Sequence, residues 1–94
     1  MDAEGPLLRS RALRTLEGHA GWVSAVALTP HGKRAVSASG DRTLAVWELE
    51  TGEVVATFAT DSAVHACAVA HDGLTFVAGD AQGCVHFLRL ENAS

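Results

Sequence analysis

The sequence lacks the features that mark secreted, membrane-spanning and nucleic-acid-binding proteins. Its 94 residues include only two cysteines, Cys67 and Cys84, which are too few for a disulfide framework. No apolar run approaches the length that crosses a bilayer, and the acidic start at residues 1–6 does not resemble a secretory signal. A formal charge of −4 makes no electrostatic case for nucleic acid. We therefore expect a cytoplasmic protein with neither nucleic acid nor a membrane as partner.

Charged residues are also scarce. They make up 19% of the chain, whereas hydrophobic residues make up 48%, which excludes a disordered protein. A chain this short buries only a modest share of its surface when it folds alone. The low charge therefore suggests that another chain covers part of the surface.

A repeat runs through the sequence. Residues 11–16 align with residues 53–58 at an offset of 42, and the offset becomes 41 after one residue is lost from the next loop. At that spacing Gly32 falls on Gly73. A period of this length is typical of a four-stranded propeller blade. Short runs of Val, Thr and Trp broken by Gly and Asp, without a long helical stripe, favour strands over paired helices.

The pattern of turns predicts an all-β antiparallel meander. We expect eight strands, at residues 11–16, 22–28, 34–39, 43–49, 54–58, 64–70, 75–78 and 84–90.

Two motifs in the first repeat resemble those of WD-repeat β-propeller proteins. Gly18-His19 stands near its start, and Trp47-Glu48 follows 28 residues after the histidine. The resemblance covers about residues 11–90 and is closest to the last repeats of large bacterial WD-repeat proteins. It implies that each repeat begins with the outer strand of one blade and continues with the three inner strands of the next.

The resemblance therefore implies a domain organisation. Residues 1–10 are a flexible leader, and residues 11–16 are an outer strand donated to a neighbouring blade. Residues 17–58 form a complete blade, and residues 59–94 form a second, degenerate blade that lacks its outer strand. The expected fold is thus a partial β-propeller of two antiparallel four-stranded blades, the second completed in trans.

The resemblance also implies a structural hydrogen-bond network in the complete blade, formed by His19, Ser37, Asp41 and Trp47. Asp41 would accept from a neutral His19, whose other nitrogen accepts from Ser37, and Ser37 would accept from the Trp47 indole. The Ser, His and Asp could also be a catalytic triad. Because no nucleophile-elbow motif surrounds Ser37, we favour the structural interpretation.

The second repeat has lost this set. The four corresponding positions are occupied by Asp61, Ala78, Gln82 and Leu88. Degenerate terminal repeats are common in such arrays, so the second blade is expected from the period and the turns alone.

Histidines and cysteines raise the question of a zinc site. His65 with Cys67, and Cys84 with His86, would each lie on one face of a strand. The two strands are expected to be separated by a third, so they lie about 9–10 Å apart, whereas zinc–ligand bonds are about 2.0–2.3 Å. We therefore expect no metal and no cofactor, and we expect both cysteines to be small core residues.

The preferred function is a noncatalytic protein-interaction scaffold that assembles head-to-tail into a closed propeller. Its expected partners are further copies of itself, as a trimer or tetramer, and an unidentified protein or peptide. The first alternative is a C-terminal fragment of a larger bacterial WD-repeat signalling regulator without independent activity. The second is a small Ser-His-Asp hydrolase. In the preferred assembly an inter-chain latch pairs with residues 84–90 of a neighbour and consists of Arg11, Ala12, Leu13, Arg14, Thr15 and Leu16.

Overall fold

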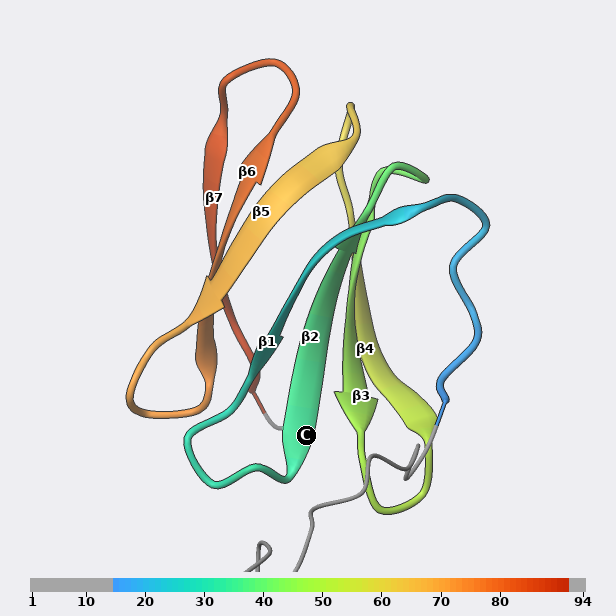
Figure 1. The fold of residues 1–94 in the computed structure, drawn as a ribbon. Helices are drawn as coiled ribbons and strands as arrows, with labels where there is room; N and C mark the ends of the chain where they lie inside the picture. The colour runs from blue at the N-terminus through green and yellow to red at the C-terminus, as the bar shows by residue number, and fades with distance from the viewer. Residues whose placement is uncertain (1–14, 92–94) are drawn as a thin grey trace, which may run out of the picture.

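The computed structural model describes residues 15–91, which form two antiparallel β-sheets and no helix (Figure 1). Strands that follow one another in sequence are neighbours in each sheet. The first sheet contains β1 (Val23–Leu28), β2 (Arg34–Ser39), β3 (Thr43–Glu48) and β4 (Glu53–Ala59). The second contains β5 (Val64–Val69), β6 (Thr75–Asp80) and β7 (Val85–Arg89). The all-β fold class and the partial propeller are thereby confirmed.

Seven of the eight expected strands occur within one or two residues of their predicted bounds. The remaining one, residues 11–16, lies outside the described residues except for Thr15 and Leu16, which belong to no strand. The expected leader, residues 1–10, also lies outside them. β6 extends two residues beyond its prediction because the Asp80 N–H donates to the Cys84 carbonyl oxygen at 3.0 Å, which prolongs the hairpin.

The repeat is visible in the backbone as well as in the sequence. β1 and β5 each carry a bulge at the start of the strand, at residues 23–25 and 64–66. Gly32 and Gly73 occupy the corresponding turns of the two sheets, each with φ of 70°. Glycine is favoured at such an angle because a Cβ would clash with the backbone. The two sheets are therefore built on the same local conformations, 41 residues apart.

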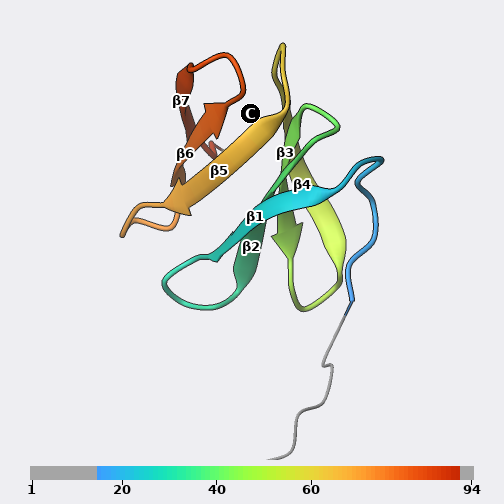
Figure 2. The same ribbon diagram turned by 45° about the horizontal axis from the view of Figure 1, so that its top comes forward.

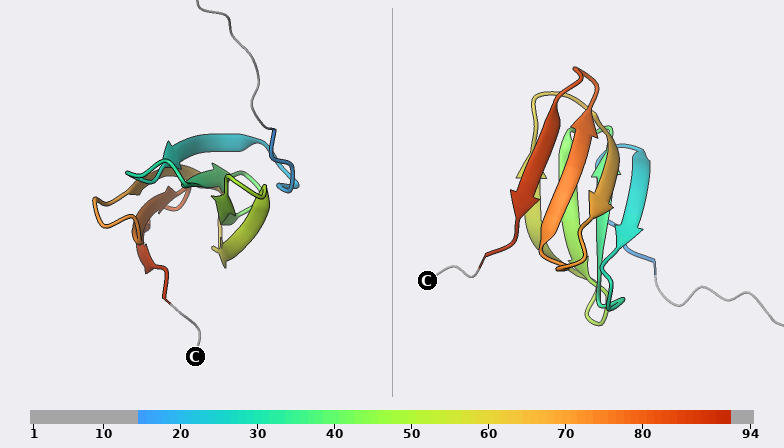
Figure 3. Two further views of the ribbon diagram at one scale, coloured as in Figure 1. Left: turned by 90° about the horizontal axis from the view of Figure 1, so that it is seen from below. Right: turned by 90° about the vertical axis from the view of Figure 1, so that its left-hand side faces the viewer.

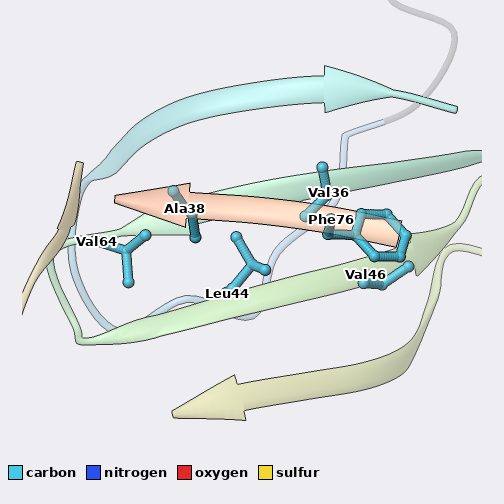
Figure 4. Packing of buried hydrophobic residues seen from close by; sticks show 7 residues of the cluster. Val36, Ala38, Leu44, Val46, Val64 and Phe76 are labelled. Carbon is cyan, nitrogen blue, oxygen red and sulfur yellow. The ribbon is translucent and has the colours of Figure 1, made fainter. Parts of the chain in front are cut away.

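One face of each sheet is buried against the other sheet. Strands alternate their side chains between the two faces, so every second residue of β2 and β3 points towards the second sheet. β5 lies against β1, and the sheets spread apart towards β4 and β7 (Figures 2 and 3). The core between them consists of Val36, Ala38, Leu44, Val46, Val64, Phe76 and Ala78 (Figure 4).

The opposite face of the first sheet is only partly covered. Ala35 and Trp47 are buried on this face, about 5% and 4% exposed. Val26 and Leu28 of β1, on the same face, are 63% and 60% exposed. We call the surface formed by Val26 and Leu28, together with the neighbouring Leu16, the leading face.

The outer face of the second sheet is exposed in the same way. Val85 and Phe87 of β7 are 60% and 75% exposed, and Val77 of β6 pairs with Phe87 on that face. We call the surface formed by these three residues the trailing face. The two sheets thus meet through one apolar face each and leave a second apolar face uncovered.

Replacing Val64 by alanine tests the contact between the sheets. Val64 is fully buried in the core, so the variant loses two buried methyl groups and leaves a small cavity. The free energy of unfolding in urea should fall by about 2 kcal/mol. The control is Val55→Ala on β4, where the side chain is 46% exposed and the change should stay within about 0.5 kcal/mol. Equal effects of the two substitutions would contradict this packing.

Candidate functional site

The four side chains of the expected network meet on the face of the first sheet that carries Ala35 and Trp47. His19 Nδ1 lies 3.1 Å from Asp41 Oδ2, and its Nε2 lies 2.6 Å from Ser37 Oγ. The Trp47 indole N–H donates to the same Ser37 oxygen at 2.8 Å. One neutral histidine tautomer satisfies every atom, because Nδ1–H donates to Asp41 while Nε2 accepts from the Ser37 hydroxyl.

Asp41 is the most highly connected member of the network. Its carboxylate accepts from the Ala20 N–H at 2.9 Å, from the Thr43 N–H at 3.0 Å and from the Thr43 hydroxyl. Partial burial alone would raise the pKa of Asp41. The hydrogen bonds from Thr43, Ala20 and His19 outweigh that effect and hold its pKa far below the ordinary value of 3.8. Asp41 is therefore ionised in the folded protein well into the acidic range.

Sequence reasoning missed two further members of the network, Ser39 and Thr43. The Ser39 hydroxyl donates to the Trp22 carbonyl oxygen at 2.9 Å and accepts from the Asp41 N–H at 3.1 Å. The sequence contained a signal for both residues, because they lie two positions before and after an aspartate in a turn. Hydroxyl side chains at these positions are suited to hydrogen-bond the backbone and the carboxylate of that aspartate. The network therefore holds the turn from both sides as well as the segment before β1.

Gly18 permits the segment before β1 to close over the network. A Cβ at this position would lie 2.9 Å from the Trp47 ring, which is buried and has little room to move. The neighbouring His19 ring meets Trp47 edge-on, with ring centroids 6.1 Å apart. Gly18 thus allows the backbone to approach the Trp47 ring closely, and His19 supplies the side chain that hydrogen-bonds within the network.

The Ser-His-Asp arrangement does not present a usable nucleophile. Ser37 is 5% exposed, and its oxygen is already engaged by both His19 and Trp47. A catalytic serine must reach a substrate carbonyl beside an oxyanion hole. The contacts of Ser37 therefore support the structural interpretation of the set.

The second sheet contains a different polar pair, which sequence reasoning did not find. Ala78 and Leu88 have no polar side-chain atom, so the network of the first sheet cannot form here. Instead, His86 Nε2 lies 2.8 Å from Asp80 Oδ2. Asp80 also accepts from the Cys84 N–H at 3.0 Å. The hydrogen bond with His86 has the largest effect on the pKa of Asp80, and both bonds lower it. The pair joins the end of β6 to the start of β7.

The cysteines and histidines do not converge. β6 lies between β5 and β7, and residues 15–91 contain no group of three or more side chains that could hold a metal ion. Cys67 is half-buried against the core, where burial raises its thiol pKa. Cys84 is exposed, so its assignment to the core was wrong. Its place in the turn before β7 keeps it away from the contact between the sheets.

The end of the sheets at which β1, β3, β5 and β7 begin forms a surface of connected loops, which we call the loop end (Figure 1). Trp22 is 70% exposed there, and its ring lies so close to Gly40 that a Cβ would stand 2.5 Å away. The loops are linked by backbone hydrogen bonds of 2.9 Å: Gly40 N–H to Trp22 O, Thr60 N–H to Arg42 O and Ala81 N–H to Ala63 O.

The loop end is also acidic. Four carboxylates stand in or beside its loops, and Arg42 is the one Lys or Arg among the described residues there. The carboxylates belong to Glu17, Asp41, Asp61 and Asp80. An exposed indole in acidic surroundings is suited to contact a positively charged partner.

Comparison with known proteins agrees with this architecture. Residues 19–90 match the family of the TEP-1 C-terminal beta-propeller. The chain belongs to this family. It is a WD-repeat β-propeller chain, as its sequence motifs suggested. No helix in the described part of the chain is long and apolar enough to cross a membrane.

Several relatives match one part of the chain. The pre-mRNA-splicing factor prp46 of Emericella nidulans is 40% identical over 42 residues, which are 45% of this chain and 9% of that protein. The small ribosomal subunit protein RACK1 of Trypanosoma brucei brucei is 52% identical over 40 residues, 43% of this chain and 13% of that protein. The chain therefore spans about a tenth of their length. The bacterial setting stays a prediction.

A solved structure shows the same fold over most of the chain. The structure of U3-55K superposes with a TM-score of 0.76 at 23% sequence identity. The match covers 81% of this chain and 25% of that one. At this identity the likeness concerns the fold alone.

Replacing Asp41 by asparagine tests the network and its pH dependence. At neutral pH the free energy of unfolding should fall by about 1–3 kcal/mol, because an amide cannot accept every bond that the carboxylate accepts. The folded pKa lies below the ordinary 3.8, so ionised Asp41 stabilises the fold above about pH 4 and this contribution is lost as the pH falls further. Urea midpoints at pH 7 and pH 3 should therefore differ less in the variant. Asp61→Asn, at an exposed site, is the control, and an unchanged acid sensitivity of Asp41→Asn would contradict the assignment.

Proposed function

We propose that the chain is a noncatalytic protein-interaction scaffold whose blades stack head-to-tail into a closed β-propeller. The name of one relative, the small ribosomal subunit protein RACK1, describes a component of a larger assembly. In this chain the Ser-His-Asp set is used to hold loops rather than to attack a substrate. The loop end is the proposed binding surface.

The proposed assembly rests on one observation: residues that are exposed in one sheet correspond, by the repeat, to residues that are buried in the other sheet. Val85 and Phe87 on the trailing face lie 41 residues after Leu44 and Val46, their equivalents in the first sheet. Leu44 and Val46 are 2% and 4% exposed because the second sheet covers them. The trailing face is thus the same kind of surface that already packs against a following blade. An apolar face of this kind favours association.

The exposed residues of the leading face also correspond to residues that pack against the core. Val26 and Leu28 correspond to Cys67 and Val69, both of which pack against the core between the two sheets. The leading face of one copy is therefore the surface that would receive the trailing face of another. Such a heterologous contact closes a ring when its rotation allows. With two blades per chain, the about 4–8 blades of known propellers correspond to two, three or four copies, and among these we favour a trimer or a tetramer.

Native mass spectrometry tests the assembly. The intact chain should have three or four times the 9.8 kDa mass of one copy. Phe87→Ser should shift the population towards the monomer, because Phe87 is 75% exposed in one copy and is proposed to be buried by the next. Val55→Ser on β4 is the control with an exposed valine. A folded, monodisperse monomer of the intact chain would overturn the assembly.

A second candidate keeps the same stacking but places it within a longer protein. The chain spans 25% of U3-55K and about a tenth of prp46 and RACK1, so further blades of one polypeptide could cover both faces. This corresponds to the alternative of a larger signalling regulator of which the chain is a part. In that case the 94 residues alone would give the monomer or aggregates in the same mass measurement.

The proposed ligand of the loop end is a basic peptide segment of another protein. Lysine and arginine pair favourably with an exposed tryptophan ring, and the neighbouring carboxylates add attraction. Peptides selected from a displayed library on the immobilised chain should be rich in these residues. Trp22→Ala should weaken their binding at least tenfold while leaving the unfolding midpoint almost unchanged, because only the Trp22 backbone takes part in the described hydrogen bonds. Peptides that bind Trp22→Ala as well as the intact chain would contradict this surface.

A further inference from the structure

We propose that Phe87 on the trailing face of one copy fills a cavity over Ala35 at the leading face of a second copy of this chain. This inference rests on the head-to-tail stacking proposed above and names the contact that selects the partner. Phe87 is 75% exposed, which makes it the most exposed large hydrophobic side chain in residues 15–91. Ala35 lines the cavity together with Trp47, which stands opposite it in the sheet.

The contact inside one chain shows how the two faces would meet. Val46 of β3 and Phe76 of β6 belong to one core cluster, and Figure 4 shows the Phe76 ring beside Val46. An offset of 41 converts Val46 into Phe87 and Ala35 into Phe76. The pairing registers of the two sheets obey the same offset. Phe87 of one copy should therefore face Ala35 of the next copy in the way that Val46 faces Phe76.

The sizes of the two residues are exchanged between these contacts. Within the chain the smaller side chain, Val46, belongs to the first sheet, and the larger one, Phe76, belongs to the second. Between copies the larger side chain is Phe87, and the smaller one, Ala35, receives it. Two phenylalanines at this place would overpack the contact, whereas alanine against valine would leave a hole, and both are destabilising. The trailing face therefore matches the leading face of its own chain.

The cavity over Ala35 is the uncovered equivalent of a smaller cavity between the two sheets. The smaller cavity, of about 130 Å³, is lined by Phe76 and Leu88, and Val46 stands on its opposite wall. The cavity at the leading face is lined by the equivalent residues, Ala35 and Trp47, and measures about 330 Å³. It is larger because alanine replaces phenylalanine and no second sheet of residues 15–91 closes it. A cavity of about 150 Å³ holds benzene, so a phenyl ring has room here.

The polar atoms beside this cavity are already hydrogen-bonded. His19 and Ser37 also line it. Both ring nitrogens of His19 and the Ser37 oxygen take part in the network of the first sheet. A phenyl ring can therefore cover them without leaving a buried donor or acceptor unpaired. The ring would also lie near the indole of Trp47, and aromatic pairs attract each other beyond the area that they bury.

Exchanging the two sizes tests the contact. Ala35→Phe fills the cavity, and Phe87→Val removes the ring that enters it. Each variant alone should raise the concentration at which the oligomer half-dissociates by about tenfold or more. The double variant Ala35→Phe/Phe87→Val copies the sizes of the internal pair and should return to within about threefold of the intact chain. Sedimentation over a dilution series measures the dissociation. Val55→Phe, at an exposed position of β4 outside both faces, is the control.

A second variant that fills the cavity keeps the test valid if Ala35→Phe disturbs the fold. Ala35 is buried, so a larger side chain there can lower the stability of a single copy. Val26 lines the same cavity and is 63% exposed, so Val26→Phe leaves the core intact. It should dissociate the oligomer in the same way and be rescued by Phe87→Val. The unfolding midpoint in urea decides which of the two variants is used.

The outcomes separate this contact from the stacking itself. If the intact chain is an oligomer but the double variant assembles no better than either single variant, the Phe87 contact is wrong and the stacking stands. The same conclusion follows if both single variants assemble like the intact chain. A folded monomer of the intact chain would overturn the stacking and this contact with it. Rescue by the double variant supports a second copy as the partner of both faces.

Discussion

Each sheet of this chain has two apolar faces, and the contact between two sheets can bury only one face of each. That constraint governs the rest of the structure. The inner faces form the core around Leu44 and Phe76, which are almost completely buried. The outer faces carry Val26 and Phe87, which are mostly exposed. Because the exposed positions of one sheet correspond to buried positions of the other, the repeat itself supplies a complementary pair of surfaces. The proposed scaffold follows from this pairing rather than from any feature of a single blade.

The second organising feature is the ionised carboxylate of Asp41. A partly buried charge is stable only if it is well hydrogen-bonded, and His19, Ala20 and Thr43 provide those bonds. They also hold the segment before β1 against the turn between β2 and β3, so the loops around Trp22 form a defined surface. In the second sheet the carboxylate of Asp80 is also hydrogen-bonded, but its side-chain partner is His86 on the next strand. The two blades therefore reach similar loop geometry with different side chains.

The candidate site shows where residue patterns are informative and where they are not. Asp41, His19, Ser37 and Trp47 were found because their spacing follows a known motif, and the structure places them in one hydrogen-bonded chain. The pair of Asp80 and His86 was missed because its members meet across two strands without a motif to mark them. Cys84 was assigned to the core because alternation along a strand was extended by one residue into a turn, where the side chain faces solvent.

The sequence by itself determined the strands, their antiparallel order and the period of the repeat, because short β-branched runs and turn residues act locally. It also indicated the network of the first blade through its spacing. Only the tertiary structure decided which faces are covered. Burial depends on what packs against a strand, and Val85 and Phe87 of β7 are as apolar as Leu44 and Val46 of β3. The exposure of Val85 and Phe87, and the edge of β7 that no strand of residues 15–91 pairs with, follow from the arrangement of the two sheets in space.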